Sequence, residues 1–156
     1  KCAFCYHSTV DWLLTDNVNS IVDKLEYFYD AGNKLEKVVD ESRSTQGFKD
    51  GTNTSNDYVY DLNGNMIRDE NKGITNIEYN HLSLPTRVTI QEKYINYIYD
   101  ATGTKLSKSI DRGSENEITY YAGNYIYKKE AGRGTPIELQ FFNHAEGYIQ
   151  AESQYL

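Results

Sequence analysis

The residues best suited to metal or thiol chemistry lie at the start of the sequence. Cys2 and Cys5 are separated by two residues and His7 follows, which places three zinc-ligand types close together. A structural zinc site takes four ligands, and the other histidines, His81 and His144, are far along the chain. A redox pair needs a strand-to-helix context that lowers a thiol pKa, and the pattern here has none. We therefore interpret the pair as a terminal dithiol or a short-loop disulfide, and we expect no metal and no cofactor.

Three aspartates recur after tyrosines and could be read as the carboxylate pairs of a glycoside hydrolase. They are Asp30, Asp61 and Asp100. The alternative is that each caps its own turn by accepting backbone N–H groups. Asn80 and Asn143 stand in the equivalent place elsewhere, and a catalytic acid could not be exchanged so freely for an amide. This substitution pattern favours turn capping, and we expect that the chain is not an enzyme.

Tyrosine is the dominant aromatic residue, with 15 Tyr against 5 Phe and 1 Trp. Tyrosine suits strands with one half-buried face, where the ring packs and the hydroxyl still reaches a partner. If strands stack in register, the rings form ladders that either stabilise the sheet by cross-strand packing or bind sugars and line a cavity. The ladder candidates are Tyr27, Tyr29, Tyr58, Tyr60, Tyr97, Tyr99, Tyr125 and Tyr127.

The element that must position these residues is a strand, a tight turn and a return strand. In residues 58–66, Tyr58 and Tyr60 alternate with Val59, and Asn63-Gly64 supplies a hairpin turn. The aromatic residues next to successive turns are separated by 19, 20, 22 and 21 residues, at Tyr60, Tyr79, Tyr99, Tyr121 and Phe142. Tyr29 precedes Tyr60 by 31 residues, which is one such interval plus an inserted loop. A period near 20 residues predicts a repeat architecture.

The pattern predicts an all-β fold, built as a repetitive antiparallel hairpin ribbon that forms a curved, open sheet. Residues 1–24 fit no repeat and are interpreted as a lead-in segment, either strand or short amphipathic turn, that packs on the first repeat. Residues 25–156 form the β-sheet domain, with a polar surface loop at 41–57. Turns are expected at Gly32, Gly64, Gly103, Gly123 and Gly147.

These motifs resemble those of a known family. Tyr60-Asp61-x-x-Gly64 and Tyr99-Asp100-x-x-Gly103 are similar to the YD-repeat signature of RHS (rearrangement hotspot) proteins, and Tyr29-Asp30-x-Gly32 has the same residues with one fewer between them. In a third repeat, Tyr79-Asn80 replaces the Tyr-Asp pair. Residues 60–74, continuing to Leu84-Pro85, especially resemble RHS proteins of Bacteroides-like bacteria. The resemblance covers roughly residues 25–150.

The resemblance implies a β-ribbon that spirals into a hollow shell around a C-terminal effector, which an aspartyl autoprotease in the terminal core region releases. No stretch of this sequence matches the cleavage motif, so the family's catalytic residues are not carried over. The resemblance implies a non-catalytic shell segment of a secreted or surface-displayed bacterial protein, whose partners are the rest of the shell and its effector. The alternative is a binding module that recognises a glycan or a protein through a tyrosine-rich face.

Charge and hydropathy limit the classes of partner. A net charge of −7 and a pI near 4.9 disfavour nucleic acid and anionic membranes. No apolar run approaches the ~20 residues that span a bilayer, so we expect no membrane insertion. Lys1 is not an initiator methionine, and we expect the chain to be a piece of a longer protein. A ribbon of only five or six repeats leaves open edges, so we also expect homodimers.

Overall fold

The computed structural model describes residues 7–12, 22–42, 44–51, 55–111, 113 and 116–151, and for residues 7–12 it describes the backbone alone. These residues contain thirteen β-strands and no helix, and every strand pairing given for them is antiparallel. The predicted all-β class is therefore confirmed. The chain divides into two compact units, Lys1–Asn76 and Ile77–Leu156.

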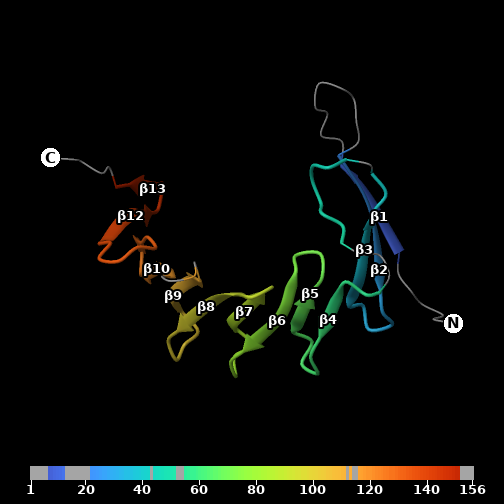
Figure 1. The fold of residues 1–156 in the computed structure, drawn as a ribbon, viewed down its shortest axis with the longest axis horizontal. Coiled ribbons are helices and arrows are strands. Elements are labelled where there is room, and N and C mark those ends of the chain that lie inside the picture. Colours follow the sequence, from blue (N-terminus) through green and yellow to red (C-terminus); the bar gives the residue numbers. More distant parts are fainter. Residues whose placement is uncertain are drawn as a thin grey trace. The chain divides into compact units, whose positions relative to one another are not determined.

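The first unit contains a three-stranded sheet and a separate hairpin (Figure 1). The sheet has the order β1-β2-β3, formed by β1 (His7–Trp12), β2 (Asp23–Tyr29) and β3 (Leu35–Asp40). The hairpin consists of β4 (Tyr58–Tyr60) and β5 (Met66–Asp69), and β6 (Ile74–Tyr79) begins beside β5. Between Asp40 and Tyr58 the described residues form no strand. Strand β1 thus lies within the segment that we interpret as the lead-in, and Leu25 on β2 lies opposite Val10.

In the second unit, each strand lies beside the strand that precedes it in the chain. The end of β6 is followed by β7 (Pro85–Ile90), β8 (Lys93–Tyr99), β9 (Lys105–Asp111), β10 (Asn116–Ala122), β11 (Tyr125–Lys129), β12 (Ile137–His144) and β13 (Gly147–Gln150). Short turns suffice because antiparallel neighbours need no crossover. Gly123, with φ 61°, opens the two-residue loop between β10 and β11.

The C-terminal hairpin differs in detail from the sequence prediction. Gly147 is the first residue of β13, and Ala145-Glu146 forms the turn before it. Phe142 pairs with Tyr125 on one side and with Ile149 on the other, so it lies inside β12 rather than beside the turn. The prediction was wrong here because β12 continues for two residues past Phe142, to His144.

Buried apolar side chains occur only in the first unit, as far as the structure describes the chain. They are Val22, Leu25 and Val38. The described strands of the second unit carry half-buried aromatic and aliphatic side chains instead, so cross-strand pairs contribute most of their packing. The tyrosine-rich composition therefore corresponds to thin packing rather than to a dry core.

Three hairpins contain a β-bulge next to the turn, at Tyr29, Tyr60 and Tyr99. In the third hairpin, Ile98 lies opposite Ser107 while Tyr99 lies opposite Lys105, so Leu106 is the extra residue. A bulge increases local twist and changes the direction of nearby side chains. The same irregularity thus accompanies the same Tyr-Asp pair three times.

Candidate functional site

The Asp61 turn shows how the repeat motif is built. Asp61 Oδ1 accepts hydrogen bonds from the backbone N–H groups of Asn63 at 2.9 Å and Asn65 at 2.8 Å. The Asp61 N–H donates to the carbonyl of Asn65, and the Gly64 N–H donates to the carbonyl of Asp61. One carboxylate oxygen therefore satisfies two turn amides that no strand partner could reach.

The same bonds recur in three other turns. The side-chain Oδ1 of Asp30, Asn80 or Asp100 accepts from the amides two and four residues later, at 2.8–3.0 Å. The backbone bonds within each turn are also the same. Asn80 performs the role as well as the aspartates because only an accepting oxygen is needed.

A residue with positive φ follows each capping residue by three positions. These residues are Asn33 (63°), Gly64 (85°), Ser83 (56°) and Gly103 (89°). The sequence comparison aligned Gly32 with Gly64, as if the first turn were one residue shorter, and this alignment was wrong. The first turn has the full length, and Asn33 takes the left-handed position because asparagine tolerates it better than most residues.

The capping bonds also change the acidity of two carboxyl groups. The Asn65 side-chain amide, followed by the turn N–H groups, lowers the pKa of Asp61. The Thr102 hydroxyl and the amides of Thr102 and Thr104 lower the pKa of Asp100. Both groups are therefore held as carboxylates, the form that accepts hydrogen bonds and does not donate them.

The tyrosine of the motif bonds to a neighbouring turn. Tyr60 Oη donates to the carbonyl of Leu35 at 2.8 Å, and Tyr99 Oη donates to the carbonyl of Pro85 at 3.0 Å. Each acceptor lies five residues after the capping residue of an earlier turn, Asp30 or Asn80. Burial raises the pKa of both tyrosines, so both hydroxyls remain protonated donors at neutral pH.

Lysine side chains lie against some of the same rings. Lys34 Nζ is 5.6 Å from the centre of the Tyr60 ring, and Lys105 Nζ is 4.9 Å from that of Tyr97. Arg87 approaches the Tyr94 ring more closely, at 3.9 Å. These cations cover aromatic faces that would otherwise be open to water.

Asp57 occupies a position that the sequence analysis missed. It is 1% exposed, and its Oδ2 accepts from the Val38 N–H at 2.8 Å and from Asn71 Nδ2 at 3.0 Å. Its own N–H donates to the carbonyl of Glu36, and its carbonyl accepts from the Glu70 N–H. Asp57 therefore connects β3 to the turn after β5. The only sequence signal is an aspartate placed directly before the Tyr58 strand.

A second buried carboxylate lies near the first. Asp69, also 1% exposed, is opposite Tyr58 in the β4–β5 pair and accepts from the Lys72 N–H at 3.1 Å. Burial raises the pKa of Tyr58, and the charges of Asp69 and Asp57 raise it further. The phenol is thus kept neutral beside two carboxylates.

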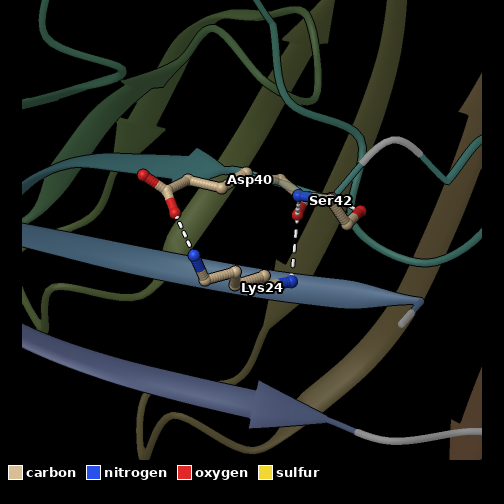
Figure 2. A network of polar contacts seen from close by, with 4 residues as sticks. Lys24, Asp40 and Ser42 are labelled. Atoms are coloured by element: carbon tan, nitrogen blue, oxygen red, sulfur yellow. Dashed lines mark hydrogen bonds and ion pairs between the residues drawn. The ribbon is translucent and has the colours of Figure 1, made fainter. Parts of the chain in front are cut away.

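The end of β3 carries a third polar network (Figure 2). Asp40 Oδ1 accepts from the backbone N–H groups of Lys24 and Ser42, and the Ser42 hydroxyl lies 2.9 Å from Asp40 Oδ2. Burial opposes ionisation of Asp40, but these hydrogen bonds outweigh it and lower the pKa. The network fixes the start of the polar segment 41–57 against β2.

An open groove of about 430 Å³ lies on one face of the last four strands. Its floor includes Phe141 and Tyr148, whose ring centres are 5.6 Å apart in an edge-to-face arrangement. Gln140 is an extra residue in β12, because Tyr127 lies opposite Leu139 and Ile126 lies opposite Phe141. This bulge places Gln140 and Phe141 along the same groove.

The structure describes no cluster of three or more His, Cys, Asp or Glu residues that could hold a metal ion in the part of the chain that it covers. Cys2 and Cys5 lie outside that part, and the side chain of His7 is not described. The terminal dithiol or short-loop disulfide therefore stays a prediction. Among the described residues, no helix is long and apolar enough to cross a membrane.

Comparison with known proteins identifies no relative: no family model, curated protein or solved structure matches this chain.

Proposed function

We propose that this chain is a non-catalytic structural segment of an RHS/YD-repeat shell, in a large secreted or surface-displayed bacterial protein that encapsulates or presents a C-terminal effector. The observation that carries the proposal is the fourfold turn, with the same capping bonds at Asp30, Asp61, Asn80 and Asp100. These side chains suit turn capping rather than acid catalysis, because in each turn Oδ1 accepts from the turn's own amides and one of the four residues, Asn80, is not an acid.

The tyrosine bonds support the same proposal. Tyr60 reaches Leu35 although the polar segment 41–57 separates β3 from β4, and Tyr99 reaches Pro85 with no such segment between the strands. Repeats in such an architecture interact mainly with their neighbours. An inserted segment is therefore tolerated provided that contacts of this kind are retained.

The test uses the parent protein rather than the segment. We expect a polypeptide of variable sequence to follow the repeats, and we expect it to resist proteolysis until the shell is opened by denaturant. Electron microscopy should show a hollow particle. A parent that forms a solid or filamentous particle, or whose C-terminal region is cleaved as fast as an isolated peptide, would exclude encapsulation.

A second candidate function is a binding module for a glycan or a protein, favoured by the groove at Phe141 and Tyr148. The exposed ring of Tyr148 and the half-buried ring of Phe141, beside the carboxamide of Gln140, offer stacking and hydrogen bonds together. Screening the chain against a glycan array tests this function, with Tyr148→Ala as the matched variant. Binding that persists unchanged in this variant would place the recognition surface elsewhere.

A further inference from the structure

The junction between β3 and β4 is held differently from the strand pairs on either side of it. The two strands belong to different sheets, and no β-ladder joins them. Among the described residues, the bonds that connect β3 to β4 and to Asp57 just before it include Asp57 N–H to the Glu36 carbonyl, Val38 N–H to Asp57 Oδ2, and Tyr60 Oη to the Leu35 carbonyl. We call these three bonds the β3–β4 seam. Two of them use side chains where a continuous sheet would use backbone groups.

Asp57 stabilises the closed seam incompletely. Its Oδ1 is buried and has no hydrogen-bond partner among the described residues. A buried acceptor without a donor loses its hydration without compensation. Opening the seam would return this oxygen to water, so part of the cost of breaking the three bonds is recovered on opening.

The sheets on the two sides of the seam have their own support. Val38 and Leu25 are buried in the β1–β3 sheet, and β4 is fully paired with β5. The described residues of the polar segment 41–57 bond on both sides of the seam, since the Phe48 N–H donates to Asp23 Oδ1 and the Gly51 N–H donates to Asn71 Oδ1. Opening of the seam therefore also breaks the Gly51–Asn71 bond.

We propose that the β3–β4 seam opens and closes locally while both sheets remain folded, and that Asp57 is the residue that holds it closed. The seam is a conformational device within the first unit, and the proposal goes beyond the shell function and does not depend on it. Opening exposes the outer edge of β3, where the Val38 N–H and the Glu36 carbonyl become available to solvent.

Hydrogen exchange of single amides, measured by NMR on the whole chain, tests the proposal. N–H groups alternate in direction along a strand, so the Val39 amide points toward β2 while the Val38 amide points to the seam. In the unmodified protein, Val38 should exchange at least tenfold faster than Val39. Its exchange should also depend little on urea, whereas that of Val39 follows global unfolding. Equal rates and equal urea dependence at the two amides would overturn local opening.

Substitutions of Asp57 test whether its carboxylate holds the seam closed. Asp57→Ala should accelerate Val38 exchange by at least tenfold and keep its weak dependence on urea, because the substitution destabilises the closed seam relative to the open one. Asp57→Asn retains one accepting oxygen and should accelerate it less. Equal effects of the two substitutions would contradict the acceptor role.

A more distant substitution tests whether the three bonds open together. Tyr60→Phe does not touch Val38, yet it should accelerate Val38 exchange about fivefold, because one hydrogen bond of the same seam is lost. Tyr99→Phe removes the corresponding bond in the second unit and should leave Val38 unchanged. If Tyr60→Phe has no effect on Val38, the bonds open independently and the proposal is wrong. If Asp57→Ala fails to fold, the comparison of Tyr60→Phe with Tyr99→Phe still tests whether the seam opens as one unit.

Discussion

At the scale of single residues, the turn motif requires a side-chain oxygen that accepts hydrogen bonds, and it does not require that side chain to be charged. Asp61 and Asn80 make the same two bonds to turn amides, although one side chain is ionised and the other is neutral. The carboxylate therefore stabilises the turn through the position of its accepting oxygen rather than through its charge. The lowered pKa of Asp61 is a result of the capping bonds, with Asn65 as the largest contributor.

We expect Asp61→Ala to lower the urea midpoint of unfolding clearly, because the amides of Asn63 and Asn65 lose their acceptor. Asp61→Asn should cost less, because it keeps the oxygen that accepts from the two amides, as in Asn80, and loses only the acceptor of the Asn65 side-chain amide. Urea titrations followed by circular dichroism measure both midpoints. Equal losses for the two variants would show that the charge, and not the accepting oxygen, stabilises this turn.

The sign of the pH dependence follows from the same bonds. A carboxyl group whose pKa is lower in the folded state stabilises the fold above its unfolded pKa, which is about 4. That contribution is lost as the pH falls through the folded value. Asp61→Asn combined with Asp100→Asn should therefore reduce the loss of stability between pH 5 and pH 3. An unchanged acid profile in the double variant would contradict the lowered pKa values.

Ser83 provides a test of the left-handed turn position. Its φ of 56° lies where two other turns place glycine, and such a conformation costs a non-glycine residue about 1–2 kcal/mol. Glycine loses more entropy on folding, which offsets about half of the gain. Ser83→Gly should thus stabilise the protein by about 0.5 kcal/mol in thermal melts. Gly103→Ala is the opposite control, since its φ is 89° and a Cβ would lie 3.1 Å from Leu84 Cδ1; it should destabilise.

At the scale of the elements, the tyrosine hydroxyl joins one hairpin to the hairpin that precedes it. Tyr99→Phe should cost about 1 kcal/mol, the usual value of one hydrogen bond. Burial raises the pKa of Tyr99. The neutral phenol therefore contributes stability below pH 10 that is lost as the pH rises through the folded pKa.

Unfolding measured across alkaline pH separates the contribution of the Tyr99 hydrogen bond from the effect of ionising its hydroxyl. The stability difference between the unmodified protein and Tyr99→Phe should be greatest near neutral pH and should shrink above pH 10. Tyr148, which is 66% exposed, supplies the control, because Tyr148→Phe removes an exposed hydroxyl and should leave the stability unchanged. A constant difference for Tyr99→Phe across this pH range would exclude ionisation of its hydroxyl as a destabilising event.

The elements also show which parts of the fold can be predicted from sequence. The turn at Asp61 is local, since its bonds join residues two and four apart, and Tyr-Asp-Leu-Asn-Gly-Asn contains all the necessary groups. Asp57 and Val38 are 19 residues apart and meet across a polar segment that has no periodic pattern. No local preference encodes that contact, so it required the structure. The motif aligns Gly32 with Gly64, whereas Asn33 fills the left-handed position of the first turn. Glycine alone does not mark that position, because asparagine also tolerates it.

At the scale of the whole chain, the two units differ in how they are stabilised. Val22, Leu25 and Val38 form a small buried core in the first unit, and the described part of the second unit contains no comparable residue. Several large apolar side chains there are exposed instead, including Ile98, Ile137, Tyr148 and Ile149. A sheet that keeps apolar side chains in water gains free energy when another surface covers them.

This exposure predicts self-association of the chain through its C-terminal hairpin. Within the described residues, β13 has no strand on its outer side, and residues 147–150 carry neither a charge nor a proline to prevent pairing. Two copies can pair β13 antiparallel without opposing like charges.

The net charge of −7 opposes association, and salt weakens this repulsion beyond about 8–10 Å. Sedimentation should therefore show dimers that increase with concentration and with salt. Ile149→Lys should shift the protein to monomers, whereas Leu62→Lys, in an exposed turn of the first unit, should not. A chain that stays monomeric at high concentration in both low and high salt would show that this edge does not mediate association.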